Sequence, residues 1–278
     1  MNNAGHLSLG MLLGTLWLGQ TGGFSGEHGI LGAAITLVGV AIGSRAPDID
    51  HKTSTASKLI TPFPAHLRRK FNLFGSFLTL VGLSLCLFRF GMLPAPGWLP
   101  DKLLLSAPLV TGSGLLLLAL SRLRDLILLG VGALVLAGYM IFHWHWFAAF
   151  AGVAVMAIPF VRHRGIIHTP EFAMALTIGG LSLVAYSPWW LAAFMAGLVI
   201  GWWTHLAGDL PGKEGIHSLF VPRLKLALNL FANGGKAERW VTRVSWSLCV
   251  CMWVWMLAWP GSMPVMETLE HVRLLPYS

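Results

Sequence analysis

The stretch Arg162-His163-Arg164-Gly165-Ile166-Ile167-His168-Thr169 places two histidines and two arginines within eight residues. Apolar runs near 146–161 and 171–186 stand on either side of it. Roughly 20 apolar residues cross a bilayer as a helix, so the first of these runs is short and also suits a half-inserted segment. We therefore expect the stretch to lie where two apolar helices meet the polar surface of a membrane.

The composition of the whole chain is that of an integral membrane protein. Of its 278 residues, 55% are hydrophobic and 11% are charged, whereas a soluble domain has roughly 25% charged residues. The net charge of +8 would favour nucleic acid as the partner of a soluble protein. In membrane proteins basic residues instead collect in cytoplasmic loops. We therefore expect the lipid bilayer as the partner, and no nucleic acid.

The apolar runs predict an all-α, polytopic membrane bundle of about nine transmembrane helices, because a lipid-facing backbone must satisfy its own hydrogen bonds. The runs lie near 7–24, 28–44, 72–92, 103–121, 125–142, 146–161, 171–186, 189–208 and 244–260. We treat 1–278 as a single membrane-embedded domain. Within it, the nearly charge-free region 72–160 supplies extra scaffold helices. Residues 209–243 form a cytoplasmic loop and 261–278 a tail.

The distribution of Lys and Arg predicts an orientation for these helices. If the N-terminus is cytoplasmic and every run spans, all of the 19 basic residues except Arg89, Lys102 and Arg273 fall in inner segments. Inner loops of membrane proteins are enriched in such residues. We therefore expect a multi-pass protein of the inner (cytoplasmic) membrane, with its N-terminus in the cytoplasm and its C-terminus outside.

His205 and Asp209 form the clearest pair of candidate metal ligands, at the inner end of the helix predicted at 189–208. Residues i and i+4 share one face of a helix, so both side chains can reach one ion. An imidazole with a carboxylate suits zinc, manganese or iron. The alternative is a His–Asp hydrogen bond at a helix end.

The segment Ala46-Pro47-Asp48-Ile49-Asp50-His51 supplies a second set of candidates at the same face. Pro47 disfavours helix at Ala46, so the second helix should stop here and continue as an extended loop. In such a loop Asp48 and Asp50 point to one side and offer two oxygen ligands. An ordinary turn, in which aspartate is common, is the alternative.

The two histidines of the stretch quoted first are five residues apart, so one regular helix would not aim them together, but Gly165 permits a bend that could. Thr169-Pro170-Glu171 predicts a helix start, with Thr as N-cap, Pro at the first position and Glu in the first turn. A helix start beside Arg162 and Arg164 favours an anion such as a phosphate ester. A plain basic loop explains the arginines but not two histidines.

His6 precedes the first predicted helix and lies at the same inner face. A single histidine is more often structural than a metal ligand. We include His6 among the candidate ligands because it lies at the same face as the others. Pairs of small residues, which let helices approach closely, occur at Gly10–Gly14, Gly39–Gly43 and Gly197–Gly201. The helices that contain these pairs are three of those that bear candidate ligands.

Three further features have plainer interpretations. His143-Trp144-His145-Trp146 is expected in an outer aromatic belt rather than at a metal. Leucine at every second position within 222–230 predicts a strand or edge on the membrane interface. Residues 238–243 are expected to form a short surface helix.

These segments, in this order, resemble the YdjM-like family of predicted membrane-bound metal-dependent hydrolases. The matching residues are Gly5-His6, Pro47-Asp48-Ile49-Asp50-His51, His163-Arg164-Gly165-Ile166-Ile167-His168-Thr169, Gly201 through His205 to Asp209, Gly215-Ile216, Leu219 to Pro222, and Glu238. The chain departs from the pattern in the longer region 72–160 and in His217, where the family usually lacks histidine. The resemblance implies an enzyme of the hydrolase class (EC 3.-) without specifying its substrate.

We therefore predict a metal-dependent hydrolase that acts on a phosphoester or lipid-like substrate at the inner leaflet. One or two divalent ions, zinc or alternatively manganese or iron, would activate a water molecule. Asp50 is assigned as general base, and Arg162 and Arg164 as substrate-binding residues, with Arg164 also steadying charge in the transition state. The predicted metal ligands are His6, Asp48, Asp50, His51, His163, His168, His205 and Asp209.

Two other classes of protein remain as alternatives. Ion-coupled transporters place charged groups near the middle of the membrane, and no Asp, Glu, Lys or Arg lies near the middle of a predicted helix. The other alternative is a non-catalytic membrane protein with a structural metal site. No Gly-x-Ser-x-Gly sequence is present, which argues against a serine hydrolase.

Overall fold

The computed structural model describes residues 1–22, 24, 28–50, 55–61, 63–161, 165–213, 215–221, 223–230 and 232–259, with only the backbone at 50, 55, 56 and 59. Its longer helices are α1 (Asn3–Gln20), α2 (Gly29–Gly43), α4 (Ala65–Arg89), α6 (Ala107–Ser121), α7 (Leu123–Phe142), α8 (Trp146–Ala157), α9 (Pro170–Val184), α10 (Trp189–Asp209) and α11 (Lys236–Ala258). Short helices are η2 (Ala46–Asp50), α3 (Thr55–Ile60), α5 (Asp101–Leu105), η3 (Ile158–Phe160) and η4 (Ile166–His168).

Each of the nine apolar runs predicted from the sequence corresponds to one of these longer helices. The largest differences are at the starts of α4 and α11, which begin earlier than predicted, so the surface helix expected at 238–243 is the first part of α11. Within the described chain, four helices are long and apolar enough to cross a membrane, namely α4, α7, α10 and α11. The protein is therefore a helical membrane protein, while spanning by the five shorter or less apolar helices stays a prediction.

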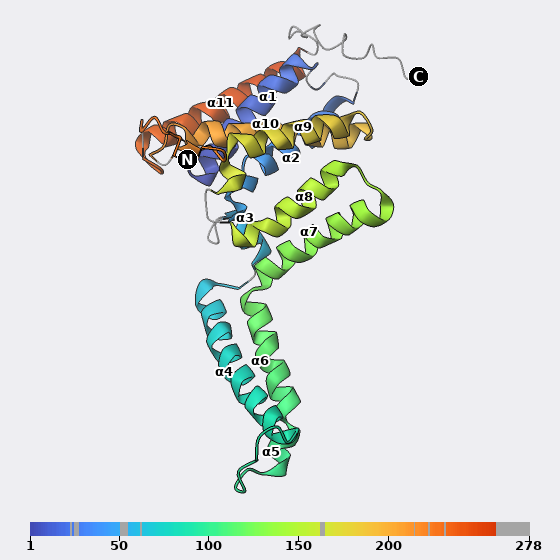
Figure 1. Ribbon diagram of the computed structural model, residues 1–278. Coiled ribbons are helices and arrows are strands. Elements are labelled where there is room, and N and C mark those ends of the chain that lie inside the picture. Colours follow the sequence, from blue (N-terminus) through green and yellow to red (C-terminus); the bar gives the residue numbers. More distant parts are fainter. Residues whose placement is uncertain are drawn as a thin grey trace.

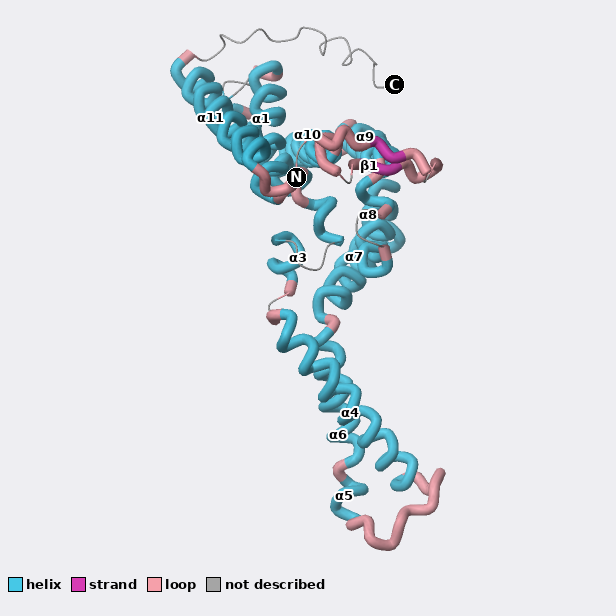
Figure 2. Tube along the Cα trace, turned by 90° about the vertical axis from the view of Figure 1, so that its left-hand side faces the viewer, coloured by secondary structure: helices cyan, strands magenta, loops and turns pink. Residues whose placement is uncertain are grey.

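The helices form a bundle with a projecting arm (Figure 1). Helices α1, α2, α9, α10 and α11 pack together, and the α7–α8 hairpin lies beside them. Helices α4 and α6 pair along their length and extend away from the bundle, with α5 near the far end of the arm (Figure 2). Gly75 and Gly114 lie at this α4–α6 contact, where an added Cβ would meet backbone atoms of the facing helix. None of the predicted ligands that the structure describes lies in this arm.

The backbones of α2 and α10 touch through glycines. A Cβ on Gly197 would overlap the carbonyl oxygen of Thr36, and a Cβ on Gly201 would overlap that of Val40. Gly43 meets the carbonyl oxygen of Leu198 in the same way. The close helix approach predicted from the small-residue pairs is therefore present, and it brings the end of α2 against the last turns of α10.

Helix α9 starts at the predicted place. Thr169 is its N-cap and its Oγ1 accepts a hydrogen bond from the Phe172 amide at 3.2 Å, followed by Pro170 at the first helical position. The preceding turn, η4, is fixed to α10 because Trp202 Nε1 donates to the carbonyl oxygen of Ile167 at 3.1 Å. Ile167 and Trp202 belong to a buried apolar cluster formed by α8, η4, α9 and α10. His168, at the end of η4, is thereby held against α10.

The segment after α2 is a 3-10 helix, so the prediction of an extended loop at residues 46–50 was wrong. Helix α2 ends at Gly43, and the Asp48 amide donates to the Arg45 carbonyl oxygen at 3.1 Å within the next turn. The fixed φ of Pro47 suits the first turn of a helix as well as an extended strand. The extended geometry that was expected to point Asp48 and Asp50 to one side is therefore absent.

The predicted strand at 222–230 is present in a short form. Strand β2 (Lys225–Leu226) pairs antiparallel with β1 (Ile216–His217), and Ile216 faces Leu226 in this pairing. The alternating leucines Leu224, Leu226, Leu228 and Leu230 are all exposed. Exposed apolar side chains beside Lys225 suit a segment at a membrane interface.

Candidate metal centre

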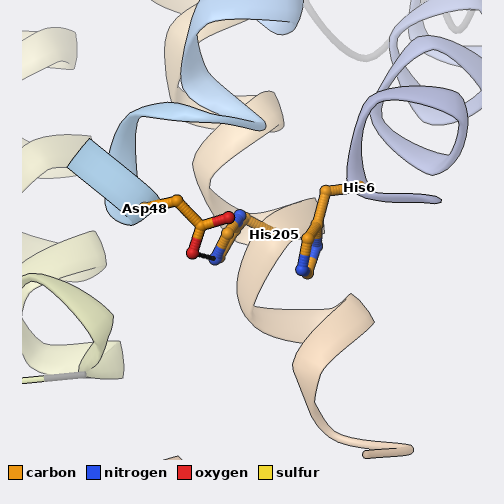
Figure 3. Close-up of side chains that lie close together, drawn as sticks. All are labelled: His6, Asp48 and His205. Carbon is orange, nitrogen blue, oxygen red and sulfur yellow. Dashed lines mark ion pairs between the residues drawn. The ribbon is translucent and has the colours of Figure 1, made fainter. Parts of the chain in front are cut away.

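Five of the predicted ligands converge at one end of the bundle, from four segments that are distant in sequence. They are His6 of α1, Asp48 of η2, His168 of η4, and His205 and Asp209 of α10. Two overlapping groups of three, His6–Asp48–His205 and His168–His205–Asp209, each have ligand atoms within 4.8 Å of one another. Figure 3 shows His6, Asp48 and His205 turned toward one another. Both groups share His205, which places this residue at the middle of the cluster.

His205 has the hydrogen bond that is typical of a metal-binding imidazole. Its Nδ1 lies 2.9 Å from the carbonyl oxygen of Ser44, and because a carbonyl only accepts, Nδ1 carries the hydrogen. Nε2 then points its lone pair into the cluster, where it is buried without a hydrogen-bond partner. A backbone carbonyl on the far nitrogen fixes the tautomer and orientation of a ligating histidine. The contact between α2 and α10 therefore orients the Nε2 lone pair of His205 into the cluster.

His6 packs directly on His205. Their ring centroids are 3.9 Å apart and the rings are inclined by 16°, so the two imidazoles are stacked. His6 Nε2 lies 3.3 Å from Asp209 Oδ1. Both histidines are buried, with 1% and 0% of their side chains exposed. The small residue Gly208 allows this packing, because a Cβ there would come within 2.9 Å of His6 Nδ1.

Asp48 is the member of the cluster that faces solvent, with 25% of its side chain exposed. Burial by itself raises the pKa of its carboxyl, but contact with His168 and the neighbouring imidazoles outweighs burial and lowers the pKa to about 2. The Asp48 carboxyl is therefore ionised throughout the physiological range. It contributes a negative charge and an accessible oxygen on the open side of the cluster.

The donor atoms fit a divalent cation. Asp48 Oδ1 lies 3.6 Å from His168 Nε2 and 3.8 Å from His205 Nε2, and Asp209 Oδ2 lies 3.6 Å from His205 Nε2. These separations exceed hydrogen-bonding distance. For zinc bonds of about 2.0–2.2 Å to nitrogen and oxygen, neighbouring ligands of a tetrahedral site are about 3.4 Å apart. Imidazole nitrogens and carboxylate oxygens at this spacing are a plausible ligand set for zinc, manganese or iron.

The remaining predicted site residues, both metal ligands and substrate-binding arginines, lie wholly or partly outside the described part of the chain. Arg162, His163, Arg164 and His51 are not described, and of Asp50 only the backbone is. Their assigned roles therefore stay predictions.

The belt histidines take no part in the cluster. His143 has a left-handed backbone conformation (φ 53°) at the end of α7, and the His145 side chain accepts a hydrogen bond from the Phe147 amide at 3.3 Å. Trp144 and Trp146 beside them are exposed. His217 lies in β1. The position of 143–146 in an outer aromatic belt stays a prediction.

Two groups that support the cluster were not predicted as such. The α-amino group of Met1 lies 2.9 Å from Asp209 Oδ1. Glu238, in the first turn of α11 and fully buried, accepts hydrogen bonds from the Asn2 amide at 2.6 Å and from the Gly234 amide at 2.7 Å. In the sequence Glu238 appeared only as part of the family resemblance and as the first residue of the expected surface helix at 238–243. An acidic residue shortly before an apolar run was the available indication of its role.

We predict that Glu238→Gln destabilises the protein by about 1–3 kcal/mol, because one amide oxygen cannot replace a buried carboxylate that accepts from two backbone amides. The start of α1, and with it His6, should loosen. The change is measured as a lower thermal unfolding temperature in detergent. Asp101→Asn, an exposed acid at the start of α5, is the control and should leave that temperature unchanged. Equal stability of the two variants would contradict a holding role for Glu238.

Comparison with known proteins supports the membrane assignment. A family model described as "YdjM inner membrane protein" matches residues 1–267. No curated protein and no solved structure matches the chain. The matched range includes all five residues of the cluster as well as the α4–α6 arm. The chain therefore belongs to the YdjM inner membrane protein family.

Proposed function

We propose that this protein is a divalent-metal-dependent hydrolase of the inner membrane. The observation that carries the proposal is the convergence of His6, Asp48, His168, His205 and Asp209, with buried imidazole nitrogens facing two carboxylates. The Met1 α-amino group offsets one of the two carboxylate charges, and a buried charge that is not compensated is costly, so a bound cation would stabilise the rest of the cluster. Zinc suits the ligand set best, with manganese and iron as alternatives, and the shared position of His205 in two ligand groups is compatible with one or two ions.

Each residue of the cluster has a proposed role. His6, His168, His205 and Asp209 hold the cation from the buried side, and Ser44 fixes the ring of His205 through its carbonyl oxygen. Asp48 closes the site on the side that substrate and water reach. A bound cation supplies the positive charge that makes a neighbouring water acidic near neutral pH. A carboxylate not fully used in binding, Asp50 in our assignment, accepts the proton, and Arg162 and Arg164 hold the anionic substrate.

The substrate that we propose is a phosphoester or lipid-like ester at the inner leaflet. The cluster lies at the ends of α2 and α10 and just before α9, which is headgroup depth if these helices cross the membrane. The distribution of basic residues favours the cytoplasmic side for this end. A transporter is the second candidate, but a cluster at helix ends supports it less than a site near the bilayer midplane would.

The test is metal analysis of the purified protein followed by removal and return of the metal. We expect bound zinc, manganese or iron at about one to two ions per chain. A chelator should abolish hydrolysis of phospho- and acyl-lipid substrates and lower the unfolding temperature, and the returned metal should restore both. Metal content at background for all three elements would contradict the proposal. Bound metal with no hydrolysis of any substrate, but with a chelator-sensitive unfolding temperature, would instead favour a structural metal site.

A further inference from the structure

A polar cavity lies where the α4–α6 arm joins the bundle. Its volume is about 580 Å³, and it is formed by the start of α4, the end of α6, the start of α7 and η3. None of the five clustered residues lines it. Arginines line its polar side: Arg68, Arg69, Arg122 and Arg124.

The positive charge of this cavity is largely uncompensated. Arg124 is buried and fully engaged, with donors to Asp125 Oδ1 at 2.7 Å, to Ser57 Oγ at 3.1 Å and to the carbonyl oxygen of Ile49. Asp125 is the one acidic residue that lines the cavity, and Arg124 neutralises it. Among the described residues, Arg68, Arg69 and Arg122 form no ion pair.

Arg68 provides a second observation that points to a ligand. Its Nε is buried and has no hydrogen-bond partner in the described chain. A buried guanidinium N–H without an acceptor is unfavourable, whereas the exposed arginines of a basic loop are solvated. The general preference for basic residues on the inner side accounts for the presence of arginine here. It does not account for a shared cavity or for a buried donor that lacks an acceptor.

The rest of the lining indicates what kind of anion fits. The cavity also has an apolar wall, formed by Leu126, Leu129, Pro159 and Phe160, and the Phe160 side chain is exposed. The planar guanidinium group of arginine donates two parallel hydrogen bonds that match the geometry of phosphate oxygens. An inorganic phosphate would fill a small part of 580 Å³ and would leave the apolar wall uncovered. A phosphate group on a molecule with acyl chains would contact both the arginines and the apolar wall.

We propose that this cavity binds the phosphate group of an anionic phospholipid. Arg68, Arg69 and Arg122 hold the phosphate, and the apolar wall of α7 and η3 covers the first part of the lipid chains. Arg124 lines the cavity and also holds η2 through Ile49, the residue next to Asp48. The lipid site is independent of the proposed hydrolase activity and does not require a metal.

The test compares lipid binding by matched double variants of the full chain in neutral detergent. Arg68→Gln with Arg122→Gln removes two charges from the cavity. Arg223→Gln with Arg239→Gln removes two exposed charges outside it. Each protein is titrated with phosphatidylglycerol, with phosphatidylcholine and with inorganic phosphate at constant ionic strength, and bound molecules are counted by native mass spectrometry.

We expect wild type to bind phosphatidylglycerol in preference to phosphatidylcholine. The cavity variant should lose about 25-fold in affinity, because each basic side chain near an anionic headgroup contributes roughly a fivefold factor. The control variant should lose less than about threefold. Without lipid, the unfolding temperature of the cavity variant should be unchanged or higher because repulsion is relieved. If this double variant does not fold, Arg122→Gln alone should still lose about fivefold.

Three outcomes would contradict the proposed lipid site in whole or in part. Equal losses in the cavity and control variants would show a general charge effect and overturn the proposed site. The proposed site is overturned as well if wild type shows no preference for phosphatidylglycerol over phosphatidylcholine and also fails to bind inorganic phosphate. Cavity-dependent binding of inorganic phosphate without binding of phosphatidylglycerol would support a phosphate site whose ligand is free phosphate, and would overturn the lipid as its source.

Discussion

Replacing His205 with alanine should lower the metal affinity of the purified protein by on the order of 100-fold or more. A protein zinc site is worth about 10–16 kcal/mol, so each of four or five ligands supplies roughly 3 kcal/mol, and 1.4 kcal/mol is a tenfold change. The loss should be greatest here because His205 belongs to both overlapping groups of ligands. Metal content after dialysis against a weak chelator measures the effect, and any hydrolytic activity should disappear with the metal.

Two further variants separate loss of metal from loss of fold. Alanine leaves the carbonyl oxygen of Ser44 unpaired, which costs about 1–3 kcal/mol by itself. His205→Gln keeps a donor for Ser44 but is a poor metal ligand, so it should unfold at a higher temperature than the alanine variant while holding no more metal. His217→Ala, a histidine of β1, is the matched control and should retain its metal. A His205→Ala protein that retains wild-type metal content would remove the basis of the proposed centre.

Replacing Gly201 with valine should prevent the protein from folding, because α2 and α10 would have to separate. The Cβ would overlap the carbonyl oxygen of Val40 and would approach the Ser44 amide. Backbone atoms cannot move aside as a side chain does, so the cost should exceed the 1–3 kcal/mol typical of overpacking. A cost of this size is a large part of a typical free energy of unfolding of about 5–15 kcal/mol. The yield of monodisperse protein in detergent and its unfolding temperature measure the outcome.

The control for this variant is a glycine of the same kind in open surroundings. Gly130 lies in α7, and a Cβ built there meets nothing within 4 Å. Gly130→Val should therefore fold normally. Similar yields of the Gly130 and Gly201 variants would show that the α2–α10 contact does not determine the fold.

The sequence predicted the features that depend on composition and on local pattern. Apolar runs located the longer helices, because burial of apolar residues in lipid demands helix. Thr169-Pro170 located the start of α9, since capping depends on neighbouring residues alone. The glycine pairs indicated close helix packing without identifying the partners. The structure shows that Gly39 and Gly43 of α2 lie against α10.

The sequence did not predict features that depend on backbone atoms or on contacts between distant segments. The carbonyl oxygen of Ser44 orients His205, yet every residue has such an oxygen and no side chain marks this one. The 3-10 geometry of η2 was missed because the fixed φ of Pro47 is compatible with both a helical turn and a strand. The engagement of Arg124 with Ile49 and Ser57 joins residues far apart in the chain, so no local pattern indicates it.

The contact of Glu238 with Asn2 has a consequence for biosynthesis. The segment that orders the first residues of the chain is made more than two hundred residues after them. At about 5–20 residues per second, a ribosome needs roughly 10 to 50 seconds to cover that interval. During this time α1 is in the membrane without α11, one of the helices that it packs against. Cation loading should therefore follow translation of the last helix, and prematurely terminated products that lack α11 should be recovered metal-free.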